Sequence, residues 1–112
     1  GCISPGMKTR FRALHDYTAK LPLCAATESE ELAGLTTRQA IELGVMNGIA
    51  FEIEGYAARM RSQIEDLCVI FTGGDANFFV KRIKNTIFAN CNLVFCGLNR
   101  ILEYNASEEH LN

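Results

Sequence analysis

Two glycines, Gly73 and Gly74, follow a continuous apolar run at residues 67–72 and precede a short helical pattern at residues 76–83. Glycines at such a junction let a ligand approach the backbone, and the first turn of the next helix offers aligned N–H donors to an anion or a polar ring. Ligands of open α/β sheets bind at this end of a strand. A tight strand-to-helix turn favours glycine in any case, so the motif alone supports ligand contact and a purely structural turn equally.

A second run of small residues, Gly-Cys-Ile-Ser-Pro-Gly at positions 1–6, also precedes a helical pattern. Ser4 suits a helix cap and Pro5 suits a first helical turn, so a capped helix start is favoured over ligand contact when these residues are taken alone. Thr36 and Thr37 stand before another helix, and N-capping explains that pair without a ligand.

Other motifs of nucleotide, metal and hydrolase chemistry are absent. The chain has no GxxxxGKS/T or GxGxxG loop, no HExxH pair, and no Ser/His/Asp set in a recognisable context. Its five cysteines form no CxxC pair, and its two histidines lie far apart in sequence. We therefore assign no catalytic residue and no metal ligand, and expect a reduced, cytoplasmic protein whose cysteines pack as small hydrophobes.

The elements that must position these residues alternate between helical and extended patterns, which places the chain among α/β folds as one domain over residues 1–112. Thr36 and Gln39 have the spacing of a capping box at the start of the longest helix. The predicted order is a helix at 7–21 ended by Pro22, an acidic connection at 25–34, a helix at 37–63, a strand at 67–72, a helix at 76–83, short strands at 86–88 and 93–95, and a helix at 97–104.

The long helix at 37–63 carries apolar residues on two faces, so it needs two partners. We expect one partner to be its own sheet and the other a second subunit. Gly44 and Gly48 lie four residues apart, where another backbone can approach. The two faces consist of Ile41, Val45, Ile49 and Tyr56 on one side and Met46, Ala50, Ile53 and Ala57 on the other.

Charge and composition give no reason to expect a nucleic acid or an anionic membrane as partner. Eleven basic and thirteen acidic residues leave a formal charge of −2, with 48% hydrophobic and 21% charged residues. The longest apolar run is too short to cross a bilayer. The basic residues Lys8, Arg10 and Arg12 are interpreted as a solvated helix face.

Taken together, four segments resemble the type III pantothenate kinases, also known as the Bvg accessory factor family, in their Bacteroidetes form. Residues 3–6 are similar to the end of the family's Gly-Gly-x-Ile-x-Pro-Gly motif, and residues 37–48 to its threonine and long helix. Residues 71–76 resemble its Thr-Gly-Gly motif, and residues 97–105 its C-terminus. No single motif is specific, whereas four motifs in register are.

The resemblance implies the C-terminal lobe of an actin-like, ribonuclease H-like phosphotransferase that consumes ATP and pantothenate in the first step of coenzyme A biosynthesis. It implies a homodimer through the helix at 37–63 and a monovalent cation, K⁺ or NH₄⁺, with ligands outside this chain. By resemblance, Gly73 and Gly74 lie near the adenosine, and Ile3, Pro5 and Gly6 near the ribose and phosphates. Thr37 would contact pantothenate held mainly by the neighbouring subunit.

The family's phosphate loop and catalytic aspartates precede the position matched by Gly1, so we expect a fragment that is inactive alone. Two alternatives stay open. The first is a transcriptional regulatory or protein-interaction module, as the family's second name implies, and the second is a structural dimerisation domain without a ligand.

Overall fold

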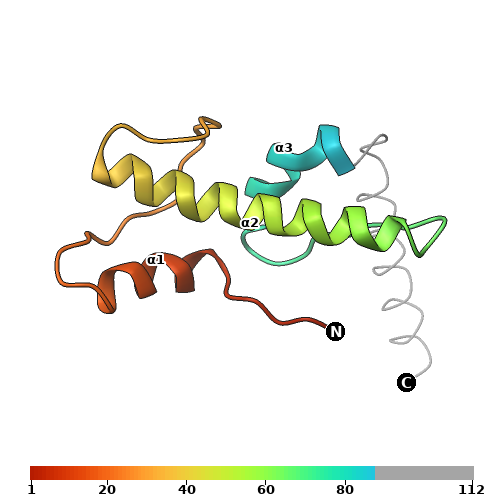
Figure 1. The fold of residues 1–112 in the computed structure, drawn as a ribbon, viewed down its shortest axis with the longest axis horizontal. Coiled ribbons are helices and arrows are strands. Elements are labelled where there is room, and N and C mark those ends of the chain that lie inside the picture. Colours follow the sequence, from red (N-terminus) through yellow and green to blue (C-terminus); the bar gives the residue numbers. More distant parts are fainter. Residues whose placement is uncertain (88–112) are drawn as a thin grey trace, which may run out of the picture. The chain divides into compact units, whose positions relative to one another are not determined.

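The computed structural model describes residues 1–87, and the side chains of residues 1–83. In this part the chain forms the three helices α1 (Met7–Asp16), α2 (Thr37–Arg61) and α3 (Ala76–Ile87) (Figure 1). Two compact units divide it, Gly1–Gly55 and Tyr56–Asn112. No helix among the described residues combines the length and the apolarity that a bilayer span requires.

In the first unit, α1 lies alongside the first half of α2 and runs in the opposite direction (Figure 1). Met7 and Phe11 are four residues apart, so both side chains fall on one face of α1, and both are buried. Ile41 and Val45 of α2 are buried as well. The apolar stripe predicted for α1 is thus confirmed as the packed face of this helix.

The helix α1 begins at the predicted residue, but its cap and its end differ from the prediction. Gly6 is the N-cap and makes no side-chain cap hydrogen bond, so the expectation that Ser4 caps the helix is wrong. The helix ends at Asp16 rather than at residue 21. The Thr18 hydroxyl donates to the Leu14 carbonyl, which is the acceptor that the Thr18 backbone N–H would need to continue the helix. The side chain therefore competes with the backbone several residues before Pro22.

The start of α2 confirms the Thr36 half of the predicted capping box, while the reciprocal bond of Gln39 goes to Leu35 rather than to the N-cap residue. The Thr36 hydroxyl accepts a hydrogen bond from the Gln39 backbone N–H at 3.2 Å, and the Gln39 side chain accepts one from the Leu35 N–H at 3.0 Å. Gly34 is held tightly here, because a Cβ added to it would lie 2.6 Å from the Ala40 backbone nitrogen. The helix ends at Arg61, two residues before the predicted end.

Within the first unit, α2 is contacted on two sides. One face turns toward α1, as described above. On another face, the buried Asn47 donates a hydrogen bond to the Glu31 carbonyl at 2.8 Å, and Leu43 lines a hollow together with Thr27 and Ser29. The connection that leads into α2 thus contacts the helix at Asn47 and Leu43, and the sheet and the second subunit expected as partners stay predictions.

In the second unit, the run predicted as a strand at 67–72 has no strand conformation, and no strand is present among residues 1–87. A strand needs a neighbour for its ladder, and the described residues offer none. The helix predicted at 76–83 continues to Ile87, so the strand expected from residue 86 is wrong at Thr86 and Ile87. The remaining predicted elements, from residue 88 onward, lie outside the described residues.

The cysteines follow the prediction only in part. Cys24 is buried in the first unit and its thiol donates to the Pro22 carbonyl, which fits a small apolar residue with a weak donor. Cys2 and Cys68 are exposed, so the expectation that they pack as small hydrophobes is wrong.

Candidate functional site

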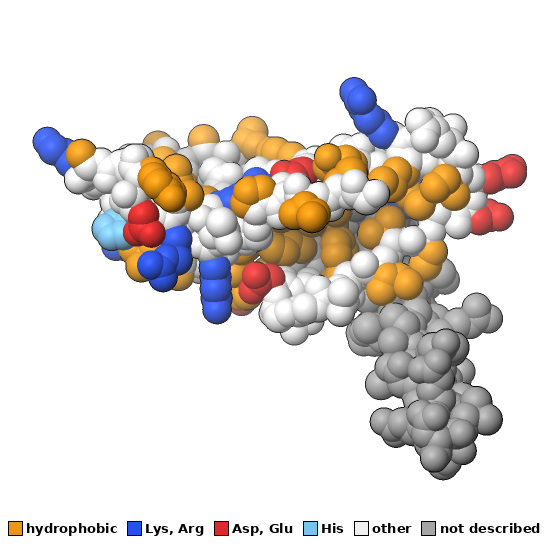
Figure 2. Space-filling view, turned by 90° about the horizontal axis from the view of Figure 1, so that it is seen from below, with side chains coloured by type: hydrophobic (Ala, Val, Ile, Leu, Met, Phe, Trp, Pro, Cys, Tyr) orange, Lys and Arg blue, Asp and Glu red, His pale blue; other side chains and the backbone are white. Residues whose placement is uncertain are grey.

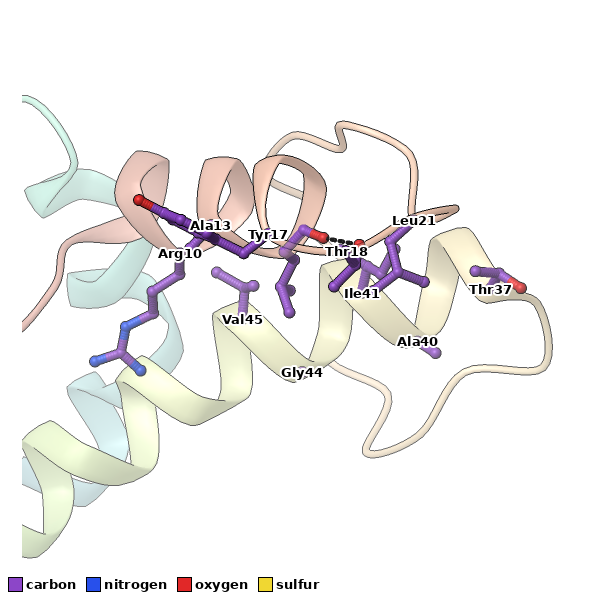
Figure 3. A pocket seen from close by; sticks show the side chains of 11 residues that line it. Arg10, Ala13, Tyr17, Thr18, Leu21, Thr37, Ala40, Ile41, Gly44 and Val45 are labelled. Carbon is purple, nitrogen blue, oxygen red and sulfur yellow. Dashed lines mark hydrogen bonds between the residues drawn. The ribbon is translucent and has the colours of Figure 1, made fainter.

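An open groove of about 900 Å³ runs between α1 and the first half of α2, within the first unit (Figure 3). Its lining is mostly apolar, and Arg10 is the one charged side chain among the described residues that form it. Hydrophobic side chains that reach the surface are also visible in the space-filling view (Figure 2). Tyr17 lines this groove and keeps 88% of its surface exposed (Figure 3). Such a mostly apolar groove suits either an apolar ligand segment or another polypeptide.

Thr37 lies at one end of this groove and Arg10 at the other (Figure 3). Thr37 is the first residue of α2, while the capping hydrogen bond is made by its neighbour Thr36. Among the described residues the Thr37 hydroxyl has no hydrogen-bond partner, and the residue is exposed. N-capping therefore explains Thr36 and leaves the Thr37 hydroxyl available to a ligand.

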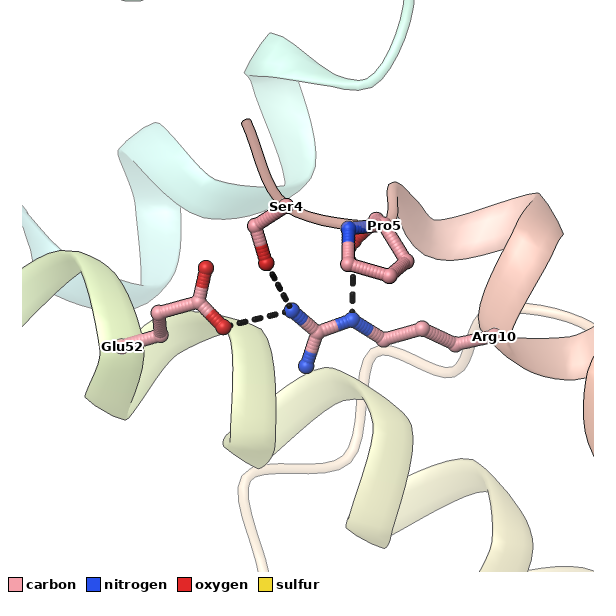
Figure 4. A network of polar contacts seen from close by, with 4 residues as sticks. All are labelled: Ser4, Pro5, Arg10 and Glu52. Atoms are coloured by element: carbon pink, nitrogen blue, oxygen red, sulfur yellow. Dashed lines mark hydrogen bonds and ion pairs between the residues drawn. The ribbon is translucent and has the colours of Figure 1, made fainter. Parts of the chain in front are cut away.

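At the other end, Arg10 joins the segment before α1 to α2 (Figure 4). Its Nε donates to the Pro5 carbonyl at 2.9 Å, and one terminal nitrogen donates to the Ser4 hydroxyl at 3.1 Å. The same terminal nitrogen lies 2.6 Å from a carboxylate oxygen of Glu52. A hydrogen bond from the Ser4 side chain, followed by one from Arg10, holds the pKa of Glu52 below its usual value.

Ile3, Pro5 and Gly6, which the sequence placed near a nucleotide, form an exposed turn, and Ile3 is fully open to solvent. Gly6 has an extended backbone with φ −75°, and a Cβ added to it would meet no atom within 4 Å. Neither its conformation nor crowding in the described chain requires glycine there. The open backbone of this turn is therefore accessible to a ligand.

Gly73 and Gly74 have a different local explanation. Gly73 has a φ of 98°, a conformation that side chains other than glycine rarely adopt, and its carbonyl accepts a hydrogen bond from the Ala76 N–H at 3.3 Å. The turn into α3 thus accounts for Gly73 without a ligand. Gly74 has no positive φ and open space at its Cβ position, so nothing in the described chain requires glycine there.

Within the first unit, the structure does not gather the predicted residues at one point. Thr37 and Glu52 are fifteen residues apart on one helix, which separates them by about 22 Å along its axis. The turn at residues 3–6, which is joined to Glu52, is therefore remote from Thr37. Gly73 and Gly74 belong to the second unit.

Sequence reasoning missed Arg10 and Glu52, because Arg10 was interpreted as part of a solvated face. A signal was present: Arg10 follows Met7 by three residues and precedes Leu14 by four, so it falls on the apolar stripe of α1. A charged residue on such a stripe indicates a fixed partner. The identity of that partner, 42 positions away, is not readable from the stripe.

The described residues contain no group of three His, Cys, Asp or Glu side chains placed to hold a metal ion. Carboxylate and carbonyl oxygens are the usual ligands of hard cations, and no such cluster occurs in this part of the chain. We therefore derive no cation site from these residues.

Comparison with known proteins identifies the family of this chain. The sequence model of the type III pantothenate kinase family matches residues 1–59. A type III pantothenate kinase of Flavobacterium psychrophilum is 51% identical over 93% of this chain and 43% of its own length. Those of Flavobacterium johnsoniae and Cytophaga hutchinsonii are 45% and 47% identical, over 93% and 94% of this chain and 43% and 45% of their own lengths.

The chain thus spans less than half the length of these curated relatives. No solved structure matches it. The printed names of these relatives describe a kinase and none describes a regulator. The family match covers more than half of the chain, including the turn at residues 3–6, Arg10, Thr37 and Glu52. The chain belongs to the type III pantothenate kinase family.

Proposed function

We propose that this chain is the C-terminal lobe of an ATP-dependent pantothenate kinase with an actin-like, ribonuclease H-like fold, acting in the cytoplasm in the first step of coenzyme A biosynthesis. The observation that carries the proposal is the continuous similarity to proteins of that name over 93% of the chain.

The nucleotide side of the proposed site is the turn formed by Ile3, Pro5 and Gly6, together with Gly73 and Gly74. Openness of the backbone at Gly6 supports a role for the turn beside the ribose and phosphates, since no atom of the described chain fills that space. Gly74 supports contact with the adenosine for the same reason. In this proposal Gly73 shapes the turn that carries Gly74.

Thr37 is proposed to contact pantothenate in the site of the partner subunit of a homodimer. The distance of about 22 Å along α2 between Thr37 and Glu52 supports this arrangement. The Thr37 hydroxyl and the turn at residues 3–6 of one chain are too far apart to act on the same reacting phosphate. A second subunit can instead bring its own turn to the pantothenate that Thr37 contacts. The hydroxyl without a partner and the mostly apolar groove beside it agree with a surface that a second subunit covers.

In the proposed reaction a hydroxyl of pantothenate attacks the γ-phosphorus of ATP, the bond to the β-phosphate oxygen breaks, and ADP leaves. Phosphoryl transfer depends on positioned phosphates, neutralised charge and a base that accepts the proton of the attacking hydroxyl. We assign positioning to the residues of this chain. The base and the ligands of the monovalent cation are assigned to the lobe that precedes it in the relatives.

The experiment that tests this proposal compares the full-length protein with the chain 1–112, each supplied with ATP and pantothenate. We expect phosphopantothenate and ADP from the full-length protein only. Absence of ATP-dependent phosphorylation in a folded full-length protein would refute the kinase assignment, and turnover by the chain alone would refute the division of labour between lobes.

A further inference from the structure

Arg10 occupies a position that an arginine rarely takes on an amphipathic helix. It lies on the stripe of α1 that also carries the buried Met7 and Phe11, and only 23% of its side chain is exposed. A charge in such a place is costly unless it is paired and hydrogen-bonded. The pairing is complete, because Glu52 of α2 lies 2.6 Å from the guanidinium.

The contacts of this guanidinium reach three acceptors in two parts of the first unit, the segment before α1 and α2 (Figure 4). They join the Pro5 carbonyl, the Ser4 hydroxyl and the Glu52 carboxylate through two nitrogens of one planar group. Guanidinium donors have a fixed fork geometry, so the three acceptors are held in one arrangement. A lysine has a single ammonium group on a flexible stem, and it cannot occupy the Nε and terminal positions together.

The turn at residues 3–6 depends on this group for its place. Ile3 is fully exposed, and Gly6 has no side-chain cap. Among the described residues, two kinds of side-chain hydrogen bond hold the turn against α2. Arg10 donates to Pro5 and Ser4, and the Ser4 side chain is hydrogen-bonded to Glu52. A turn that is fixed before the ligand arrives loses less conformational entropy on binding than a loose one.

We infer that Arg10 is a positioning residue for nucleotide use. It acts through the turn at residues 3–6, which it holds against α2, and Glu52 keeps Arg10 in place. The inference rests on the proposed function, since it takes this turn as the nucleotide side of the site. In the proposed site this turn contacts the nucleotide and not pantothenate, so loss of the Arg10 contacts raises the Michaelis constant for ATP and leaves that for pantothenate unchanged.

The test uses the full-length protein with Arg10→Lys, which keeps the charge and removes the fork. We expect KM for ATP to rise about three- to tenfold, the effect of losing the net contribution of one or two hydrogen bonds, with KM for pantothenate unchanged at saturating ATP. Arg12→Lys is the matched control on the same helix, because Arg12 is 72% exposed and pairs only loosely with Asp16 at 3.7 Å. It should leave both constants at the wild-type values.

A second variant, Glu52→Gln, keeps the size of the partner and the bonds from Arg10 to the turn. We expect a smaller rise in KM for ATP, about two- to threefold, since only the anchor of Arg10 is weakened. If Arg10→Lys does not fold, Glu52→Gln tests the positioning role of Arg10. An unchanged KM for ATP in Glu52→Gln would then overturn the inference.

Two further outcomes contradict the inference. An unchanged KM for ATP in folded Arg10→Lys excludes a positioning role, and an equal rise of both Michaelis constants with a lowered melting temperature indicates a purely structural one. These failures differ from a failure of the proposed function. In that case the wild-type protein itself shows no pantothenate-dependent consumption of ATP, and the inference falls with it.

Discussion

The turns that precede α1 and α3 look alike in sequence, since each places glycine within three residues of a helix start, yet different interactions hold them. The turn before α3 is shaped by its own backbone, with a positive φ at Gly73 and a hydrogen bond from Ala76 to the Gly73 carbonyl. The turn before α1 has no residue with a positive φ, and Arg10 holds it through side-chain contacts to α2.

The comparison shows that glycine occupies the two turns for different reasons. At Gly73 the cause is local conformation, which is present in the chain without a ligand. At Gly6 a positive φ and crowding are both excluded as causes in the described chain, which leaves the N-cap position, which glycine suits, and the approach of a ligand. A glycine that no contact or dihedral angle explains is therefore the stronger pointer to a binding site.

The largest expected effect on stability is that of Gly73→Ala. A residue with a side chain at φ 98° is strained, so we expect the free energy of unfolding of the full-length protein to fall by about 1 to 3 kcal/mol. Chemical denaturation measures it. Gly74→Ala is the matched control, since its Cβ would meet no atom within 4 Å, and equal losses in the two variants would contradict a conformational cause at Gly73 alone.

A third helix start, that of α2, extends the comparison to threonine. Thr36→Ala removes the capping hydrogen bond to the Gln39 N–H and should lower the free energy of unfolding by about 1 kcal/mol. Thr37→Ala should change stability by less than about 0.5 kcal/mol. It should instead raise KM for pantothenate. If Thr37→Ala proved the more destabilising of the two, the separation of capping from ligand contact would be wrong.

The side-chain anchor of the first turn should also depend on pH. The pKa of Glu52 is lowered from its usual 4.5 in the folded state, so the unfolded state takes up the proton first as pH falls. The stabilisation is therefore complete above about pH 5 and is lost as pH falls through the lowered pKa. Melting temperatures of wild type and Glu52→Gln, measured from neutral to acid pH, should converge at the acid end, and a constant difference would contradict the linkage.

The smallest effect on stability is expected for Gly6→Ser. Serine is at least as good an N-cap as glycine, and the space at the Cβ is open, so the free energy of unfolding should change by less than about 0.5 kcal/mol. If the open backbone of this turn receives the nucleotide, KM for ATP should nevertheless rise. Unchanged stability together with an unchanged KM for ATP would remove Gly6 from the proposed site.

Local rules predicted a large part of the described structure. The apolar stripe of α1, the capping box at Thr36 and Gln39 and the start of each helix could be read from spacing, because they depend on residues within one or two turns of each other. The end of α1 could not, because the Thr18 hydroxyl and a helical N–H compete for one carbonyl and either outcome is compatible with the sequence.

Sequence alone was sufficient to place the chain in its family, since that depends on residue identities in order along the chain. It also indicated which glycines and threonines to examine. Only the tertiary structure separated Gly6 from Gly73, distinguished Thr36 from Thr37, and paired Arg10 with Glu52. The physical reason is that a half-buried charge selects its partner by distance in the folded chain, and residues 42 positions apart become neighbours only when α1 packs on α2.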